Sequence, residues 1–269
     1  RKPQISHVFS SYQLSVTDIM LSTSVGPNLL SALLMNGKTM SVSACVTQFL
    51  VSGFFTGLEC FLLTIMSYDR YLAICNPLHY VNIMTSKHSF YLVMWSWIIM
   101  FFIVLIQIIA TCHSGFCGCN TIDYIYCDYA PLLEIFCSDT FIVEILRIIL
   151  SIPVVILPLW FIITSYIRII FSTLRISTST GRQKAFSTCT SHLTVVCTYY
   201  GILIGKYSVP SKGQSLNGNK IISLIYTMVT PLFNPIIYSF RNREIQRALR
   251  KMDLCNIVGV KNYRSGVKK

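Results

Sequence analysis

Residues 89–110 read SFYLVMWSWIIMFFIVLIQIIA and contain no charged side chain. A helix of about 20 apolar residues spans the hydrocarbon core of a bilayer, so this stretch predicts a transmembrane helix. The other apolar residues also come in long blocks rather than in short alternating runs. The blocks that reach the required length are residues 6–34, 42–66, 141–171, 186–205 and 221–240. The sequence therefore predicts an all-α membrane protein with six spans.

The amino-acid composition supports the same class of protein. The mean hydropathy is +0.60. Hydrophobic residues make up 53% of the chain and charged residues 12%, whereas about a quarter of the residues of a soluble domain are charged. The net charge of +12 has a simple explanation in a membrane protein, because basic loops and tails face anionic lipid. This explanation disfavours nucleic acid as a partner.

The basic residues predict the orientation, because Lys and Arg are retained on the cytoplasmic side of a membrane. Most of the 22 Lys and Arg residues fall at the two ends of the chain and in alternate gaps between spans. The remaining gaps hold only Lys38, Arg147, Lys206, Lys212 and Lys220. Both ends of the chain, including the C-terminus, are therefore expected in the cytoplasm.

The chain is expected to have two parts. Residues 1–240 form the helical bundle, and residues 241–269 form an Arg-rich amphipathic helix along the inner membrane face with a basic tail. The chain opens with Arg1-Lys2-Pro3 and no initiator Met, which suggests that a segment is missing upstream. A cytoplasmic start followed by six spans is what remains when one outside-to-inside helix is removed from a bundle of seven.

Cysteines gather on the predicted outer side. Cys45 begins the second span, and the long loop between the third and fourth spans contains Cys117, Cys119, Cys127 and Cys137. An oxidising exterior allows disulfides there. Zinc is the alternative for the compact Cys-Gly-Cys unit, but the loop lacks paired Cys-x2-Cys units and no His follows. The pattern predicts disulfides and leaves their pairing open.

Two short motifs at the ends of spans are candidate switch elements. Asp69-Arg70-Tyr71 ends the second span at its cytoplasmic edge. The Arg can pair with the neighbouring Asp in one state and release it in another, as a transmembrane switch requires; the alternative is an ordinary charge pair at the membrane edge. In the last span, Pro235 removes a backbone donor and bends the helix. Asn234 can bond the freed carbonyls, which indicates a hinge or a purely structural kink.

Asp18 and Glu59 are carboxylates in the middle of the first and second spans. A buried carboxylate is costly in a membrane, so such residues usually pair, protonate or bind a cation. The two residues can share a sodium ion or one proton. The alternative is that each bonds separately to a hydroxyl, for which the candidates are Ser15, Ser22 and Thr56.

Five longer strings contain or accompany these motifs: MSYDRYLAICNPLHY at 66–80, SDT at 138–140, SY at 165–166, KAFSTCTSHL at 184–193 and PLFNPIIYSFRN at 231–242. Together they resemble the olfactory (odorant) receptor family of rhodopsin-like, class A G-protein-coupled receptors. The likeness covers essentially the whole chain, and the KAFSTC block is typical of this family. It implies a seven-transmembrane receptor bundle in which the six spans are helices two to seven and helix one is missing.

The resemblance implies an odorant receptor in the plasma membrane. Such a protein binds a small-molecule odorant, activates a heterotrimeric G protein of the stimulatory type and raises cyclic AMP. No cofactor apart from a sodium ion is implied. An enzyme is disfavoured, because the chain has no Gly-rich phosphate loop and no His-Glu-x-x-His motif. The alternatives are a non-signalling fragment or pseudogene product and, from hydropathy alone, a transporter, which would show inverted repeats.

The resemblance also implies roles for individual residues. The cysteines pair as Cys45–Cys127 and Cys117–Cys137, with Cys119–Cys137 as an alternative. The odorant lies in the outer half of the bundle against a largely apolar wall with a few hydroxyls, and no acid on helix three faces it, which disfavours an amine. The wall residues are Ser52, Gly53, Thr56, Gly57, Leu150, Val154, Tyr200, Leu203, Ile204, Tyr207, Leu224 and Thr227. The switch and G-protein-coupling residues are Asp69, Arg70, Tyr71, Tyr166, Lys184, Asn234, Pro235 and Tyr238.

Overall fold

The structure is a computed structural model that describes residues 5–35, 40–113, 127–128, 132, 141–208 and 225. Its elements run in the order α1 (Ile5–Leu34), α2 (Val42–Cys75), α3 (Pro77–Ile83), α4 (Ser86–His113), α6 (Phe141–Ser151), η1 (Ile152–Ile156), α7 (Leu157–Leu174) and α8 (Ser179–Ser208). The predicted span at 221–240 and the tail at 241–269 lie outside the described residues.

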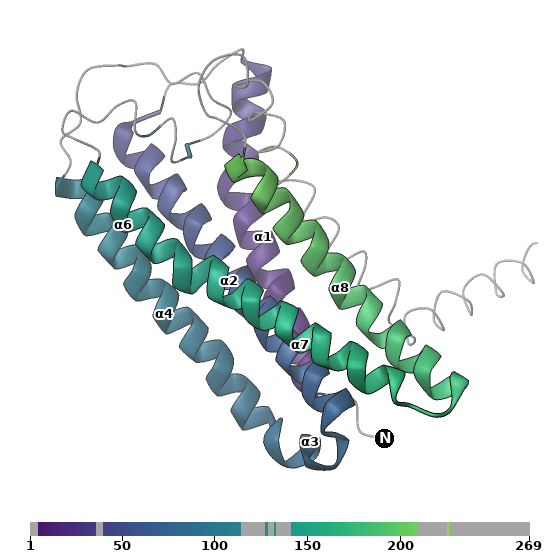
Figure 1. Ribbon diagram of the computed structural model, residues 1–269. Coiled ribbons are helices and arrows are strands. Elements are labelled where there is room, and N and C mark those ends of the chain that lie inside the picture. The colour runs from purple at the N-terminus through teal and green to yellow at the C-terminus, as the bar shows by residue number, and fades with distance from the viewer. Residues whose placement is uncertain are drawn as a thin grey trace, which may run out of the picture.

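The long helices form a bundle around α2 (Figure 1). α2 packs against α1 and α4, and also against η1, α7 and α8. The segment Phe141–Leu174 is one continuous helical rod made of α6, η1 and α7. The short α3 lies at the end of the bundle where α2 ends and α4 begins (Figure 1). The predicted all-α bundle is confirmed for the described part of the chain.

Within the described residues, three helical stretches are long and apolar enough to cross a membrane by themselves: Val42–Cys75, Ser86–His113 and Phe141–Leu174. α1 and α8 are each 30 residues long but more polar. In α1 several hydroxyls donate back to carbonyls of the same helix, as Thr17 does to Leu14 at 2.7 Å and Ser24 to Leu21 at 2.8 Å. Such bonds satisfy polar groups inside the helix.

Local sequence explains where the helices begin, end and change. The Ser41 hydroxyl caps α2 by accepting from the amide of Ala44 at 3.2 Å. α2 continues past its predicted end at residue 66 to Cys75 and stops before Pro77, which occupies the first turn of α3. Proline disfavours helical geometry in the preceding residue. Pro153 lies in the first turn of η1. Proline has no backbone N–H to donate to the preceding turn, and the helix widens to a π-type turn at this point.

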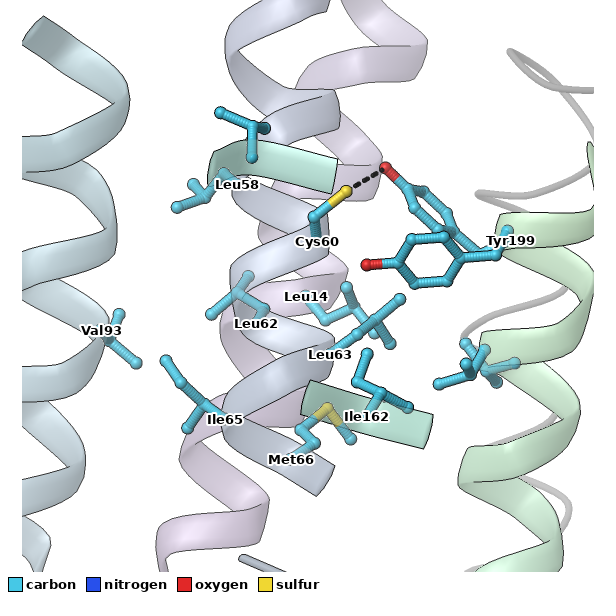
Figure 2. Packing of buried hydrophobic residues seen from close by; sticks show 14 of the residues in the cluster. Leu14, Leu58, Cys60, Leu62, Leu63, Ile65, Met66, Val93, Ile162 and Tyr199 are labelled. Atoms are coloured by element: carbon cyan, nitrogen blue, oxygen red, sulfur yellow. Dashed lines mark hydrogen bonds between the residues drawn. The ribbon is translucent and has the colours of Figure 1, made fainter. Parts of the chain in front are cut away.

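The hydrophobic core lies around the middle of α2, which neighbouring helices surround (Figure 2). Leu14 from α1, Val93 from α4, Ile162 from α7 and Tyr199 from α8 lie around it in this view (Figure 2). The outer faces of α4 and α7 carry large exposed apolar residues, including Trp95, Phe101, Trp160 and Phe171. In a bilayer such faces contact lipid, so their exposure is compatible with a stable bundle.

Candidate functional site

A buried ion pair lies at the α3 end of α2. The Nη2 atom of Arg70 is 2.6 Å from Oδ2 of Asp69, and both side chains are almost fully buried. The other Asp69 oxygen accepts from the Tyr80 hydroxyl at 2.9 Å, which ties α3 to α2. Burial and the neighbouring Asp69 carboxylate raise the pKa of Tyr80 above its ordinary value, so the hydroxyl remains a donor. The pair expected for one state of the switch is therefore present and is reinforced by a third residue.

A second polar contact joins α7 and α8. The Tyr166 hydroxyl lies 2.6 Å from Nδ1 of His192, and the two rings stack with an interplanar angle of 11°. Both side chains are buried. Tyr166 was predicted as a switch residue, whereas His192 and Tyr80 were not assigned a role. His192 lies in the string at 184–193 and Tyr80 in the string at 66–80. The motifs therefore contain both residues, but only the packing shows that they bond to Tyr166 and Asp69.

Of the remaining residues predicted for the switch, only Tyr71 has a described side chain. Tyr71 is half-buried and packs against the core. The backbone of Lys184 belongs to the first part of α8, and its side chain lies outside the described part. Asn234, Pro235 and Tyr238 fall outside the described residues. Their roles stay predictions.

The two intramembrane carboxyl groups face each other across the α1–α2 contact. Asp18 and Glu59 are both buried, and the Asp18 carboxyl interacts electrostatically with that of Glu59. Both Glu59 oxygens are fully buried, with Asp18 as their charged neighbour. This arrangement brings together the two residues predicted to share a cation or a proton.

Two of the hydroxyls considered as separate partners for these acids are engaged elsewhere. Ser15 donates to the carbonyl of Ser11 at 3.2 Å, and Ser22 donates to the backbone carbonyl of Asp18 at 2.8 Å. A serine hydroxyl has a single proton to donate, so neither is left to donate to a carboxylate. The shared arrangement is favoured over separate hydroxyl partners at these two positions.

The predicted ligand wall is partly assembled around α2. A methyl group added at Gly57 would overlap the end of the Met100 side chain and approach a Val154 methyl to 3.0 Å, so this glycine permits close packing of α2, α4 and η1. The same methyl at Gly53 would meet no atom within 4 Å. The structure therefore brings Gly57 and Val154 together and leaves open space beside Gly53.

The α8 side of the wall combines apolar and hydroxyl groups. The Tyr199 hydroxyl donates to the carbonyl of Thr56 at 2.7 Å and lies 3.4 Å from Sγ of Cys60 (Figure 2). Its neighbour Tyr200 is also buried, and the Tyr200 hydroxyl lies close to the Cys60 thiol. Tyr199 was not predicted to belong to the site, because a tyrosine pair in an apolar helix does not reveal which ring faces α2.

Of the other predicted wall residues, some lie on the inner face of their helix, one is exposed, and some lie outside the described residues. Leu203 is 2% exposed, whereas Ile204 is 55% exposed. Leu203 lies one helical turn after Tyr199 on the inner face, whereas Ile204 points about 100° further round the helix, so the structure does not place Ile204 in the wall. Ser52 donates to the Phe49 carbonyl at 3.0 Å and Leu150 packs against the core. The side chain of Tyr207, and all of Leu224 and Thr227, lie outside the described residues.

A disulfide joins the far end of α2 to the loop. Cys45 is bonded to Cys127, as predicted. Gln48 supports this junction from both sides: its carbonyl oxygen accepts from the Cys127 amide at 3.2 Å, and its amide nitrogen donates to the Ser24 carbonyl at 3.0 Å. Gln48 thus links the loop to α1, a role not expected from its sequence. Cys117, Cys119 and Cys137 lie outside the described residues.

Comparison with known proteins defines the class first. The fold is similar to that of squid rhodopsin, with a TM-score of 0.72 over 91% of this chain and 75% of the rhodopsin chain at 15% sequence identity. A central α2, a disulfide at one end and an Asp-Arg pair at the other thus belong to a rhodopsin-like helical bundle.

The family follows from sequence comparison. The family model described as olfactory receptor matches residues 5–256. Human olfactory receptor 9Q2 is 41% identical over 88% of this chain and 76% of its own length. Human olfactory receptor 6X1 is 43% identical over 95% of this chain and 82% of its own length. The chain belongs to the olfactory receptor family. It is thus a multi-pass membrane protein of a receptor family rather than an enzyme.

Proposed function

We propose that this chain is an odorant receptor that binds a small, mainly apolar odorant and activates a heterotrimeric G protein of the stimulatory type, raising cyclic AMP. The observation that carries the proposal is the buried Asp69–Arg70 pair. A buried pair that can open is a two-state element, and ligand binding can bias such an element. We assign the α3 end of the bundle, and with it the C-terminus, to the cytoplasmic side of the plasma membrane.

The surface beside this pair supports a protein partner at the same end. Leu78 and Val81 on α3 are 89% and 74% exposed, although α3 lies beyond the candidate span that ends at Cys75. Exposed apolar residues outside the bilayer are typical of a protein contact. Tyr80 on the same helix bonds to Asp69. A G protein that contacts α3 would thereby act directly on the switch pair.

The chemistry of the ligand follows from the wall. Val154, Leu203 and the glycines of α2 offer little polarity, and the buried Tyr200 hydroxyl is one of the few polar handles in the wall. An apolar pocket with one or two oriented polar groups suits a small ligand that carries one hydroxyl or carbonyl. We also propose that Asp18 and Glu59 share a sodium ion or a proton when the receptor rests.

The test is a cyclic-AMP assay in cells that express the chain at the surface, with a panel of volatile alcohols, ketones and hydrocarbons. We expect at least one oxygenated odorant to raise cyclic AMP, and Tyr200→Phe to weaken that response by about two- to tenfold, since a lost hydrogen bond removes about 0.5–1.5 kcal/mol. The matched control is Tyr12→Phe, which changes an exposed tyrosine on α1.

Two outcomes would contradict this proposal. A chain that reaches the surface but raises cyclic AMP with no odorant would be a non-signalling fragment. An odorant response that Tyr200→Phe and Tyr12→Phe leave equally intact would remove Tyr200 from the site.

A further inference from the structure

A small cavity opens at the first turns of α4, away from the ligand wall and the switch pair. It has a volume of about 310 Å³ and is lined by Ser86, Lys87, Phe90 and Tyr91. We propose that this cavity binds the phosphate-bearing headgroup of an anionic phospholipid. Assigning that lipid to the cytoplasmic leaflet rests on the orientation proposed above, but the binding itself does not.

The polar side of the cavity is suited to an anion. Lys87 is exposed, and within the described part of the chain it forms no ion pair. Thr85 caps the helix, because its hydroxyl accepts from the His88 amide at 3.2 Å and its carbonyl from the Ser89 amide at 3.0 Å. The amides of Ser86 and Lys87 precede these bonds and have no acceptor inside the helix. They add to the Lys87 charge in attracting a phosphate.

The other side of the cavity is aromatic. Phe90 and Tyr91 are 50% and 60% exposed, and their ring centroids are 6.3 Å apart. Phe90 also lies 6.3 Å from the Phe9 ring of α1, which holds it against the bundle. Tyrosine and other aromatic rings favour the level of the lipid headgroups. A lysine with two rings thus matches the junction between a phosphate and its glycerol and acyl groups.

The path of an acyl chain continues along α4. Trp95 follows Tyr91 by one helical turn and is also exposed, so both lie on the same face of the helix. The next residues of α4 are almost entirely apolar. A free phosphate would use only the polar side of the cavity, whereas a phospholipid uses both sides. This continuity favours the lipid as the occupant.

Native mass spectrometry of the purified chain in detergent tests the proposal. We expect phosphatidylinositol 4-phosphate to form a one-to-one adduct that phosphatidylcholine and inorganic phosphate do not form at equal concentration. Lys87→Gln should weaken the adduct by about fivefold, as expected for one lysine near an anionic lipid. Lys87→Arg should retain it. The matched control, Arg175→Gln, removes an exposed charge near the same end, at the end of α7.

Tyr91→Ala provides a second, uncharged test, because Tyr91 is largely exposed and its loss should weaken the lipid adduct without unfolding the bundle. Equal adducts for the parent and Lys87→Gln would overturn the proposal. So would an equal loss with Arg175→Gln, which would indicate unspecific attraction to charge, or equal binding of phosphatidylcholine. Binding of inorganic phosphate as tight as that of the lipid would show an anion site without a lipid. None of these outcomes depends on odorant signalling.

Discussion

The hydroxyl of Tyr166 and Nδ1 of His192 lie 2.6 Å apart, and this contact joins α7 to α8 within the described part of the chain. The rings also stack, so a buried polar contact helps to hold the two helices together. Hydrogen bonds in such surroundings are costly to leave unmade. Separation of α8 from α7 would break this bond, which is present in the same arrangement as the closed Asp69–Arg70 pair.

Removing this bond should raise signalling without odorant. Tyr166→Phe and His192→Phe each keep a ring and remove the hydrogen bond, which contributes about 0.5–1.5 kcal/mol, so basal cyclic AMP should rise by about two- to tenfold. Thr190→Ala is the control, because the Thr190 hydroxyl bonds only within α8, to the Phe186 carbonyl at 2.7 Å. Basal cyclic AMP equal to the parent's in both ring variants would mean that the bond does not restrain the resting state.

Arg70 should be needed for signalling rather than for membrane insertion. Arg70→Ala should reach the surface about as well as the parent, because Tyr80 still donates to Asp69, yet it should give no cyclic-AMP response. Arg70→Gln keeps a donor beside Asp69 and serves as the check on folding. Surface labelling and cyclic AMP measured on the same cells separate the two effects. A normal odorant response from Arg70→Ala would remove its role in the switch.

Sodium should act through the two intramembrane carboxyl groups. If Asp18 and Glu59 share a cation, Asp18→Asn should abolish any dependence of odorant affinity on sodium concentration, because one of the two ligands loses its charge. The control is Glu144→Gln, which changes an exposed acid near the start of α6. Titrations of sodium against lithium at constant ionic strength measure the effect. Identical sodium titrations in the parent and Asp18→Asn would leave only a structural role.

The glycines of α2 offer a matched pair of substitutions. Gly53→Ala adds a methyl group into open space and should raise the thermal stability slightly, by about 0.5–1 kcal/mol from helix propensity. Gly57→Ala gains the same propensity but crowds Met100 and Val154. Overpacking costs about 1–3 kcal/mol, so the net effect should be destabilising. Unfolding midpoints in detergent measure both, and equal midpoints would show that Met100 moves aside freely.

The Cys45–Cys127 disulfide should matter more than the bridge predicted within the loop. It spans 82 residues of sequence, and a disulfide stabilises by roughly 2–4 kcal/mol, more for longer closed loops. Cys127→Ser should therefore abolish surface expression or the odorant response, whereas Cys117→Ser should leave a measurable fraction. The control is Cys112→Ser, because Cys112 is free and exposed. If Cys117→Ser lost as much surface expression and response as Cys127→Ser, and peptide mapping found Cys45 as a free thiol, the greater importance of the Cys45–Cys127 disulfide would be contradicted.

Much of the architecture could be predicted because helices and their lipid-facing character depend on local composition. The uncharged run at 89–110 became α4, and the adjacent residues Asp69 and Arg70 pair as expected. Neighbours in sequence stay neighbours in any fold. Burial of Asp18 and Glu59 at matching depth was predictable as well, since their distances from the helix ends follow from a constant rise per residue.

The partners of these residues could not be predicted. Tyr80, His192 and Gln48 each bond to a residue on another element, and their contacts depend on how far each helix is rotated and shifted against its neighbour. The same rotation separates buried Leu203 from exposed Ile204 and places Gly57, but not Gly53, against Met100. The sequence by itself determined the class, the helices and the residues able to act. Only tertiary packing decided which of them meet, because helix rotation and register depend on many side chains that interlock at once.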